Sequence, residues 1–466
     1  MTFQSINPAT GEVLAEFPAH SAADVEAKLA RAARTAAIWR ATPVAARAAM
    51  VARLGALLDN EKERLGRVMT LEMGKPIRAA VEEAAKCAMA CRFYAEHGPA
   101  FVADRMMEDE EHRSFIAYDP LGVVLAVMPW NFPFWQAIRF MAPAFVAGNV
   151  GLLKHASNVP ECAMELESLV RRAGAPEGVF QTLLIPSDAV AGVLSDPRVA
   201  AATLTGSEGA GSSVASIAGK HLKPTVLELG GSDPFIVMPS ADLARAVDTA
   251  VRARTINNGQ SCIAAKRFIV HTAIFEEFLE RFTAGMQALR VGDPLDPATQ
   301  LGPLASAKQA EELEEQVSRS VALGARLVCG GRRREFGSAY FQATVLTDIP
   351  ASSPAWSDEM FGPVGCVFRA TDAPDAIRIA NSTRFGLSAS AWTTEASEQD
   401  AFVRGIDAGS VFVNDMVVSD PRFPFGGVKS SGYGRELSDL GLHAFTNIKT
   451  VRIRTGGGSN TPANTE

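Results

Sequence analysis

The sequence lacks the features that mark membrane, secreted and nucleic-acid-binding proteins. No apolar run reaches the length of a membrane-spanning helix, and the N-terminus has no charged, apolar and cleavable signal pattern. Basic residues form no block and the formal net charge is −7, so we expect neither nucleic acid nor a membrane as a partner. Hydrophobic residues make up 47% and charged residues 21%, which is typical of a globular chain, and we expect a cytoplasmic protein.

Cysteine is sparse, with six residues in the chain. They are Cys87, Cys91, Cys162, Cys262, Cys329 and Cys366. Their spacing fits no zinc-binding pattern, so we expect no metal site. The sequence shows no disulfide framework either, which suits a reducing compartment.

The length of 466 residues predicts two or three domains. Residues 1–20 predict an extended pair around a turn. Residues 21–100 predict long helices that break at 74–76. Further along, apolar runs such as 121–128 alternate with helical stretches. Runs of this kind are typical of strands buried on both faces of a parallel sheet, so the sequence predicts a doubly wound α/β domain.

A second α/β unit is predicted over 235–428, after a candidate boundary at the turn 229–231. Segments 113–118 and 448–454 are candidate edge strands, the second because apolar and basic residues alternate along it. Residues 457–466 are rich in small and polar residues and are expected to form a flexible tail.

Three polar side chains suggest acyl-transfer chemistry. Cys262 ends the run Asn-Gly-Gln-Ser-Cys, although a lone cysteine is more often a small buried hydrophobe than a nucleophile. Glu228 lies between apolar neighbours before a glycine pair, and Asn131 lies within Pro-Trp-Asn-Phe-Pro. A thiol, a carboxylate in an apolar setting and an amide donor can together catalyse acyl transfer. The plain alternatives are a surface carboxylate for Glu228 and a turn residue for Asn131.

The segment 205–211, Thr-Gly-Ser-Glu-Gly-Ala-Gly, follows a predicted strand and opens a predicted helix. Glycines let a backbone approach a phosphate, and a helix N-terminus attracts anions. The spacing is not the dinucleotide fingerprint, so the segment is either a nucleotide site or an ordinary strand-to-helix turn.

Taken together, these motifs resemble the aldehyde dehydrogenase superfamily over nearly the whole chain. The segments that carry the resemblance are 129–133, 153–154, 205–207, 227–231, 259–262, 359–363 and 424–429. Within the superfamily, segments 94–99, 154–158 and 230–235 look most like succinate-semialdehyde dehydrogenases.

The resemblance implies two doubly wound α/β domains and a small β oligomerisation arm. The Rossmann-like cofactor domain would comprise 1–107 and 122–234, and the catalytic thiol domain 235–428. The arm would comprise 108–121 and 444–456. Strands of this arm pair across subunits in the family, which implies a homodimer or homotetramer.

The resemblance also implies catalytic roles. Cys262 would attack the aldehyde carbonyl as a thiolate, and Asn131 with the Cys262 backbone N–H would hold the oxyanion of the thiohemiacetal. Hydride transfer to the nicotinamide would leave a thioester. Glu228 would act as the general base for its hydrolysis.

Eight residues would bind the cofactor by resemblance: Trp130, Lys154, Ser157, Gly206, Ser207, Leu229, Glu359 and Phe361. Ser157 stands where the family often has a glutamate that binds the ribose of NAD. A carboxylate there would repel a 2′-phosphate, whereas Ser157 offers a donor and Lys154 a positive charge. We therefore expect NADP to be preferred, with NAD as the second cofactor.

Arg139 and Ser419 are the candidate substrate-binding residues. Semialdehyde-specific relatives hold the distal carboxylate with an arginine at the place of Arg139, and Ser419 could donate a second hydrogen bond. The alternatives are a surface ion pair for Arg139 and a loop hydroxyl for Ser419. Some relatives have another arginine where this chain has Ile256, and Arg254 would need a different orientation to replace it.

The expected function is therefore the oxidation of succinic semialdehyde to succinate. A second enzyme hypothesis keeps the mechanism but takes an aromatic or medium-chain aldehyde, for which Trp135 and Phe423 could provide contacts. A thiol-dependent hydrolase would not need the cofactor motifs. A catalytically silent binding or structural protein on the same fold would not need Cys262, Glu228 and Asn131 together.

Overall fold

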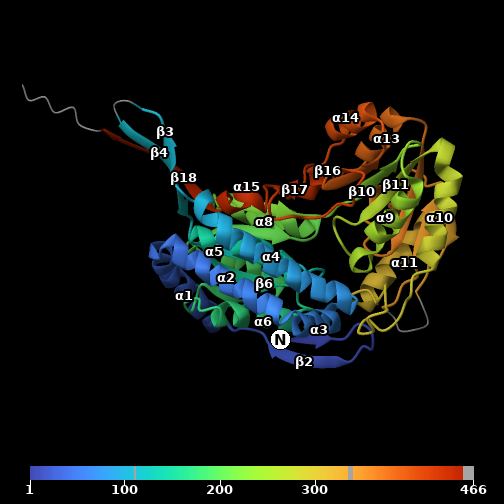
Figure 1. Ribbon diagram of the computed structural model, residues 1–466. Coiled ribbons are helices and arrows are strands. Elements are labelled where there is room, and N and C mark those ends of the chain that lie inside the picture. The colour runs from blue at the N-terminus through green and yellow to red at the C-terminus, as the bar shows by residue number, and fades with distance from the viewer. Residues whose placement is uncertain (110–111, 334–338, 455–466) are drawn as a thin grey trace, which may run out of the picture.

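The computed structural model describes residues 1–109, 112–333 and 339–454. Two lobes are each built on a mostly parallel sheet, and a narrow arm projects from the first lobe (Figure 1). The α-helices are α1 (Ala22–Ala41), α2 (Val44–Asn60), α3 (Lys62–Met73), α4 (Ile77–Phe101), α5 (Trp135–Ala147), α6 (Pro160–Arg172), α7 (Val190–Ser195), α8 (Glu208–Lys220), α9 (Leu243–Thr255), α10 (Phe275–Gln287), α11 (Ala307–Ala322), α12 (Pro354–Ser357), α13 (Ala373–Asn381), α14 (Ala396–Gly405) and α15 (Ser438–His443). Short 3₁₀ turns are η1 (Ser187–Ala189), η2 (Ile256–Gly259), η3 (Thr272–Ile274) and η4 (Lys429–Ser431).

The strands form four sheets. The first lobe contains β17 (Gly432–Tyr433), β9 (Thr225–Glu228), β8 (Val199–Thr205), β5 (Val123–Met128), β6 (Val150–His155) and β7 (Phe180–Thr182), in that order. The second lobe contains β12 (Arg326–Cys329), β13 (Thr344–Thr347), β14 (Val364–Ala370), β11 (Ala265–His271), β10 (Asp233–Val237), β15 (Ser388–Trp392) and β16 (Ser410–Val413), in that order. A hairpin pairs β1 (Thr2–Ile6) with β2 (Val13–Pro18), and the arm has the order β18 (Thr446–Arg454), β4 (His112–Pro120), β3 (Arg105–Met107).

The predicted helical region 21–100 consists of four helices. Ser21 caps α1 through a reciprocal capping box with Asp24. The predicted break at Gly74 is confirmed, where φ is 78°. The sequence analysis missed the break at Pro43, where a proline cannot continue a helix. Within the described residues no single helix could cross a membrane. α1 and α2 are long and apolar enough for a membrane span only when taken together, and the chain bends by 116° between them.

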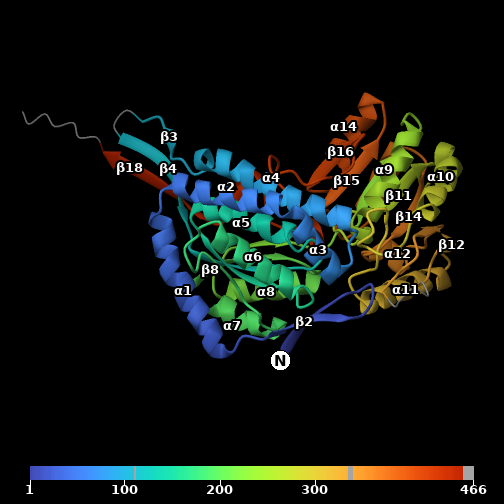
Figure 2. The same ribbon diagram turned by 60° about the horizontal axis from the view of Figure 1, so that its bottom comes forward.

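The first sheet forms where apolar runs predicted buried strands. β5 pairs in parallel with β6 on one side and with β8 on the other. Helices cover both faces of such a sheet, which explains why its strands are apolar throughout. Every residue of α5 is buried, and this helix contacts α2 and α4 as well as β5 and β6 (Figure 2). The loop between β5 and α5 is therefore anchored at both ends by buried elements.

The chain passes from the first sheet to the second between β9 and β10. The turn 229–231, which the sequence marked as a boundary, makes this connection. The chain returns to the first sheet at β17, which pairs antiparallel with β9, and α15 then packs on α4 and α5. We keep 235–428 as the proposed catalytic domain.

The arm corrects one strand assignment. Segment 113–118 was expected at a sheet edge, but β4 is the central strand of the arm because β3 pairs with its second side. β18 is an edge strand, as expected, and pairs with β4 from Thr446↔Pro120 to Arg454↔His112. The three residues of β3 had been assigned to the cofactor domain. The expected tail 457–466 lies outside the described residues.

Candidate active site

The loop before Cys262 adopts a backbone that few side chains tolerate. Asn257, Asn258 and Gly259 have φ values of 54°, 57° and 77°. Asparagine and glycine enter this left-handed region at the lowest cost. The Asn258 amide donates to the Gly74 carbonyl at 3.0 Å, which ties the loop to the C-terminal end of α3. The run that the sequence analysis singled out is therefore a turn that presents the thiol.

Lys266 fixes the same loop from the other end. Its buried ammonium donates to the carbonyls of Ser261 and Cys262 at 2.8 and 2.9 Å and lies 3.2 Å from a carboxylate oxygen of Glu359. The sequence analysis missed this lysine. The available signal was a lysine that enters β11, a strand buried along almost its whole length.

The glycine pair after Glu228 brings three distant motifs together. A Cβ atom on Gly231 would lie 2.6 Å from the Cys262 carbonyl oxygen, and one on Gly230 would lie 2.6 Å from a carboxylate oxygen of Glu359. The Gly231 N–H also donates to the other Glu359 carboxylate oxygen at 3.2 Å. The close approach to a backbone oxygen requires glycine at Gly231, whereas a side chain at Gly230 would displace the end of the Glu359 side chain.

Asn131 lies against the thiol loop, as predicted. Its buried side-chain amide donates to the Gln260 carbonyl at 3.1 Å, and its own carbonyl accepts from the Asn257 amide at 2.7 Å. An amide has two N–H donors. The second has no acceptor among the described residues, so it is available to an oxygen bound beside Cys262.

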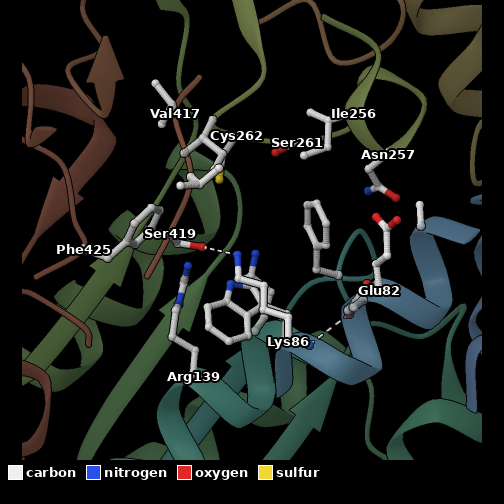
Figure 3. Close-up of a pocket in the computed structure, with 17 residues that line it drawn as sticks. Glu82, Lys86, Arg139, Ile256, Asn257, Ser261, Cys262, Val417, Ser419 and Phe425 are labelled. Carbon is white, nitrogen blue, oxygen red and sulfur yellow. Dashed lines mark hydrogen bonds between the residues drawn. The ribbon is translucent and has the colours of Figure 1, made fainter. Parts of the chain in front are cut away.

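Two cavities meet at Cys262. The first, which we call the α4–α5 cavity, has a volume of about 150 Å³ and is lined by Ala79, Glu82, Glu83, Lys86, Phe132, Trp135, Gln136, Arg139, Ile256, Asn257, Ser261, Cys262, Ile263, Val417, Val418, Ser419 and Phe425 (Figure 3). The second, the β8–α8 cavity, has a volume of about 270 Å³ and is lined by Pro129, Trp130, Asn131, Thr205, Gly206, Ser207, Leu229, Gly230, Cys262, Glu359 and Phe361. Among the described residues, Cys262 alone lines both.

Arg139 lines the α4–α5 cavity but is already engaged. It forms a buried ion pair with Glu436 and donates to the Thr205 hydroxyl at 3.2 Å. Its guanidinium also lies 4.5 Å from the centre of the Phe425 ring. The alternative of a surface ion pair is wrong because Arg139 is only 1% exposed.

A second cation in this cavity escaped the sequence analysis. Lys86, on α4, donates to the Ser419 hydroxyl at 2.7 Å, and its ammonium lies 4.3 Å from the centre of the Trp135 ring (Figure 3). Burial, together with the positive charge of Arg139, lowers the pKa of Lys86 to about 8. Nothing in the sequence around Lys86 distinguishes it from a solvated lysine on a helix.

Two other expectations for this cavity are corrected. Phe423 is 62% exposed and does not line the α4–α5 cavity. Arg254 is fully buried and donates to the Gly259 carbonyl at 2.6 Å, so it supports the loop and lines neither cavity. Ile256, in contrast, does line the α4–α5 cavity.

Glu228 is buried at the end of β9 and lines neither cavity. The surface alternative is therefore wrong, since only 2% of the residue is exposed. Neither carboxylate oxygen has a hydrogen-bond partner among the described residues. Burial raises the pKa of Glu228 well above its usual range; Glu436 raises it further and Arg139 opposes the shift. Burial at this position therefore favours the neutral form of Glu228 over the carboxylate.

The Cys262 thiol is the most accessible of the six, since the other five cysteines are buried. Burial raises the pKa of Cys262 to about 12, and the positive charges of Arg139 and Lys266 lower it only in part. The sulfur is thus a thiol rather than a thiolate in the ligand-free site.

Most of the expected cofactor residues gather in the β8–α8 cavity. The rings of Trp130 and Phe361 meet edge to face with centroids 5.7 Å apart. Ser207 caps α8 and accepts from the Ala210 N–H at 3.3 Å, so the N–H groups of the helix N-terminus face the turn that holds Gly206. Gly206, Ser207, Leu229 and Glu359 all line the cavity.

Lys154 and Ser157 lie outside this cavity, at the end of β6. Lys154 is 7% exposed and forms no ion pair within the part of the chain that the structure describes. The neighbouring His155 has its Nε2 2.9 Å from the Pro133 carbonyl and accepts the Ala156 N–H on Nδ1, so Nε2 carries the proton. Burial lowers the pKa of His155 to about 4, and this neutral ring links β6 to the loop of Asn131.

Comparison with known proteins now decides the family. The sequence pattern of the aldehyde dehydrogenase family matches residues 1–451. The chain belongs to the aldehyde dehydrogenase family. The resemblance read from the motifs is thereby confirmed over nearly the whole length of the chain.

Relatives within this family are similar over their full length. The succinate-semialdehyde dehydrogenase, NADP(+), of Mycobacterium avium is 54% identical over 469 residues, which cover 98% of this chain and 99% of the relative. The succinate-semialdehyde dehydrogenase, NADP(+), 1 of Mycobacterium tuberculosis (H37Rv) is 55% identical over 456 residues, which cover 97% of this chain and 100% of the relative. Succinic semialdehyde dehydrogenase from Streptococcus pyogenes, solved with NADP+ as the cofactor, superposes with a TM-score of 0.94 at 36% identity, with 97% and 100% covered. The predicted fold is confirmed.

Proposed function

We propose that this aldehyde dehydrogenase oxidises succinic semialdehyde to succinate, with NADP+ preferred over NAD+. The observation that carries the proposal is the position of Cys262 where a cavity suited to a dinucleotide meets a small cavity that contains cations. The mycobacterial relatives bear the name of this activity and of this cofactor, and their identity to the chain exceeds one half.

The β8–α8 cavity fits a nicotinamide dinucleotide. Thr205, Gly206 and Ser207 lie before the N-terminus of α8, where backbone N–H groups stabilise phosphate. Gly206 leaves room, since a Cβ atom there would meet nothing closer than 3.6 Å. We assign Lys154, which has no carboxylate partner among the described residues, and Ser157 to the 2′-phosphate that distinguishes NADP+ from NAD+.

Cys262 forms the first bond of the reaction. Its sulfur, after losing a proton, attacks the aldehyde carbon, and the carbonyl oxygen becomes an oxyanion. The second N–H of Asn131 and the Cys262 backbone N–H hold that oxygen, and one such donor contributes about 100- to 1,000-fold in rate. A nicotinamide dinucleotide held in the β8–α8 cavity by residues such as Ser207 and Glu359 would supply the hydride acceptor, and loss of the hydride from the adduct would leave a thioester on Cys262.

Hydrolysis of the thioester completes the cycle. Water attacks the acyl carbon, the carbon–sulfur bond breaks, and succinate leaves while Cys262 regains its thiol. Glu228 takes the proton from the water as general base. Because Glu228 lines neither cavity, its side chain must turn toward Cys262 before it can act. Leaving its buried position would remove the main cause of its raised pKa and so favour the carboxylate that a general base requires.

The α4–α5 cavity favours a short anionic aldehyde. A cavity of about 150 Å³ is the size that holds one benzene molecule in an engineered core, which suits a four-carbon substrate. The aromatic or medium-chain alternative loses one support because Phe423 does not line the cavity. We propose Arg139, Ser419 and Lys86 as the polar groups that face the substrate.

The test is nicotinamide reduction with succinic semialdehyde, butanal and benzaldehyde, each with NADP+ and with NAD+. We expect the highest kcat/KM for succinic semialdehyde with NADP+. A higher value for an uncharged aldehyde would contradict the substrate, and NAD+ favoured more than tenfold would contradict the cofactor.

We further propose a cytoplasmic homodimer or homotetramer that assembles through the arm. β18 is an edge strand, and Ile448 and Ile453 on it are 61% and 48% exposed. Such an edge is a site for strand pairing with a second copy. Light scattering on the purified protein should give twice or four times the chain mass of 49.5 kDa, and a monomer would contradict the proposal.

A further inference from the structure

Of the two cations in the α4–α5 cavity, Arg139 has a carboxylate partner and Lys86 has none among the described residues. Arg139 pairs with the buried carboxylate of Glu436, so its charge is balanced before any ligand arrives. Lys86 is partly buried, and its ammonium contacts the Ser419 hydroxyl and the Trp135 ring but forms no ion pair among the described residues. A buried ammonium without a counter-ion is unfavourable, and a ligand carboxylate would relieve this cost.

None of the three acidic residues near Lys86 forms an ion pair with it. Asp420, the neighbour of Ser419, is paired with Arg422. Glu83, one turn earlier on α4, forms a buried ion pair with Lys75. The same carboxylate accepts the backbone N–H groups of Phe134 and Trp135, both at 2.9 Å, at the N-terminus of α5. Its oxygens are therefore occupied. Glu82 lines the cavity but is exposed.

The hydrogen bond from Lys86 to Ser419 leaves a second donor at the same place. Lys86 donates to the Ser419 oxygen at 2.7 Å, so the Ser419 hydroxyl hydrogen points away from the ammonium. One carboxylate can then accept from the ammonium and from the hydroxyl. The Trp135 ring, 4.3 Å from the ammonium, holds the lysine in position.

We propose that Lys86, together with Ser419, binds the distal carboxylate of the aldehyde substrate and sets the preference for an anionic substrate. Arg139 then positions Glu436 and the Phe425 ring and contributes only a balanced charge to the pocket. This inference rests on the proposed function and assigns its substrate-selecting residue. Figure 3 shows Lys86 and Ser419 facing each other in the cavity that Cys262 lines.

The experiment compares succinic semialdehyde with butanal, which has the same chain length without the carboxylate. The measured quantity is the ratio of kcat/KM for the two substrates in wild type, Lys86→Met, Lys86→Arg and the surface control Lys308→Met. We expect Lys86→Met to lower the ratio about 10- to 100-fold through KM for succinic semialdehyde, as expected for a lost charged hydrogen bond. Lys86→Arg should retain most of the ratio, and Lys308→Met should retain all of it.

The outcomes separate this inference from the proposed function. A wild-type enzyme that does not favour succinic semialdehyde would overturn the proposed function and this inference with it. A wild-type preference that survives Lys86→Met within twofold would overturn the role of Lys86 alone. An equal loss for both substrates would show that Lys86 only supports the fold, which also contradicts the inference.

A pH profile gives an independent readout. The groups that face Lys86 are Glu83 and Cys87 on α4, Arg139 on α5 and Asp420 after β16. Because the pKa of Lys86 is lowered to about 8, its positive charge is present below pH 8 and is lost above it. The kcat/KM ratio should therefore fall as the pH rises through about 8 in wild type. In Lys86→Arg, which stays charged, this fall should be absent, and its persistence would contradict the assignment.

Discussion

Gly231 offers a direct test of how the thiol loop is held. An alanine there would place its Cβ atom 2.6 Å from the Cys262 carbonyl oxygen. Ordinary carbon–oxygen contacts are about 3.3 Å or longer, so the two backbones must separate by roughly 0.7 Å. Lys266 holds that same oxygen at 2.9 Å, so the oxygen cannot move without weakening this hydrogen bond.

The expected cost follows from this displacement. A misplacement of about 1 Å at a reacting group costs about 100-fold in rate, so Gly231→Ala should lower kcat about 10- to 100-fold. Overpacking should also lower the free energy of unfolding by about 1–3 kcal/mol. The assay is NADPH formation with saturating succinic semialdehyde, with urea unfolding followed by circular dichroism in parallel.

Gly219→Ala is the matched control, since a Cβ atom there would meet no atom within 4 Å. This variant should keep kcat at the wild-type value. Because Gly219 lies within α8, where alanine is the better helix former, it should not lower the free energy of unfolding and should raise it by up to about 1 kcal/mol. If Gly231→Ala also kept kcat within twofold while folded, the contact between the glycine turn and the thiol loop would not govern the position of Cys262.

Three further perturbations test other parts of the site. Lys266→Met leaves Glu359 without its counter-ion and should lower the free energy of unfolding by about 3 kcal/mol. This value is at the low end of the range for a broken buried ion pair, because the Glu359 side chain is 20% exposed. Adding Glu359→Gln should recover part of that loss in urea unfolding, and no recovery would contradict the coupling. Glu228→Gln should slow steady-state turnover at least about 100-fold but keep a rapid first burst of one NADPH per site. Loss of this burst would mean that Glu228 acts before hydride transfer and not in hydrolysis of the thioester. With a Cys262 pKa of about 12, iodoacetamide labelling of the ligand-free enzyme should accelerate about tenfold per pH unit from pH 7 to 9; a plateau near pH 8.5 would show an ordinary thiol.

The sequence predicted the sheets of both lobes because their strands are continuous apolar runs. A strand was expected over 121–128, and β5 was found at Val123–Met128. The same local logic placed a helix after Ser207, which caps α8. The position of β4 between two strands could not be predicted, since β3 has only three residues and no strand pattern of its own.

The motifs of the site could be predicted from the sequence, but the partners of its charged side chains could not. Asn131 and Cys262 were placed together by resemblance, and the structure brings their loops into contact. The partner of Arg139 could not be foreseen, because Glu436 approaches it only through the return of the chain to the first sheet. Lys86 meets Ser419 across 333 positions of sequence, and no local pattern records such a contact.

The meeting of two cavities at one sulfur has a consequence for how the specificities of this enzyme can diverge. Helices α4 and α5 border one side, and the turn before α8 borders the other. Of the residues that the structure describes, only Cys262 is common to both. A substitution at Lys86 or Ser419 can therefore change which aldehyde is accepted while the walls around the dinucleotide stay as they are. The converse holds for Lys154 and Ser157. Substrate specificity and cofactor specificity therefore depend on separate sets of residues and can change independently, although both cavities meet at the Cys262 sulfur.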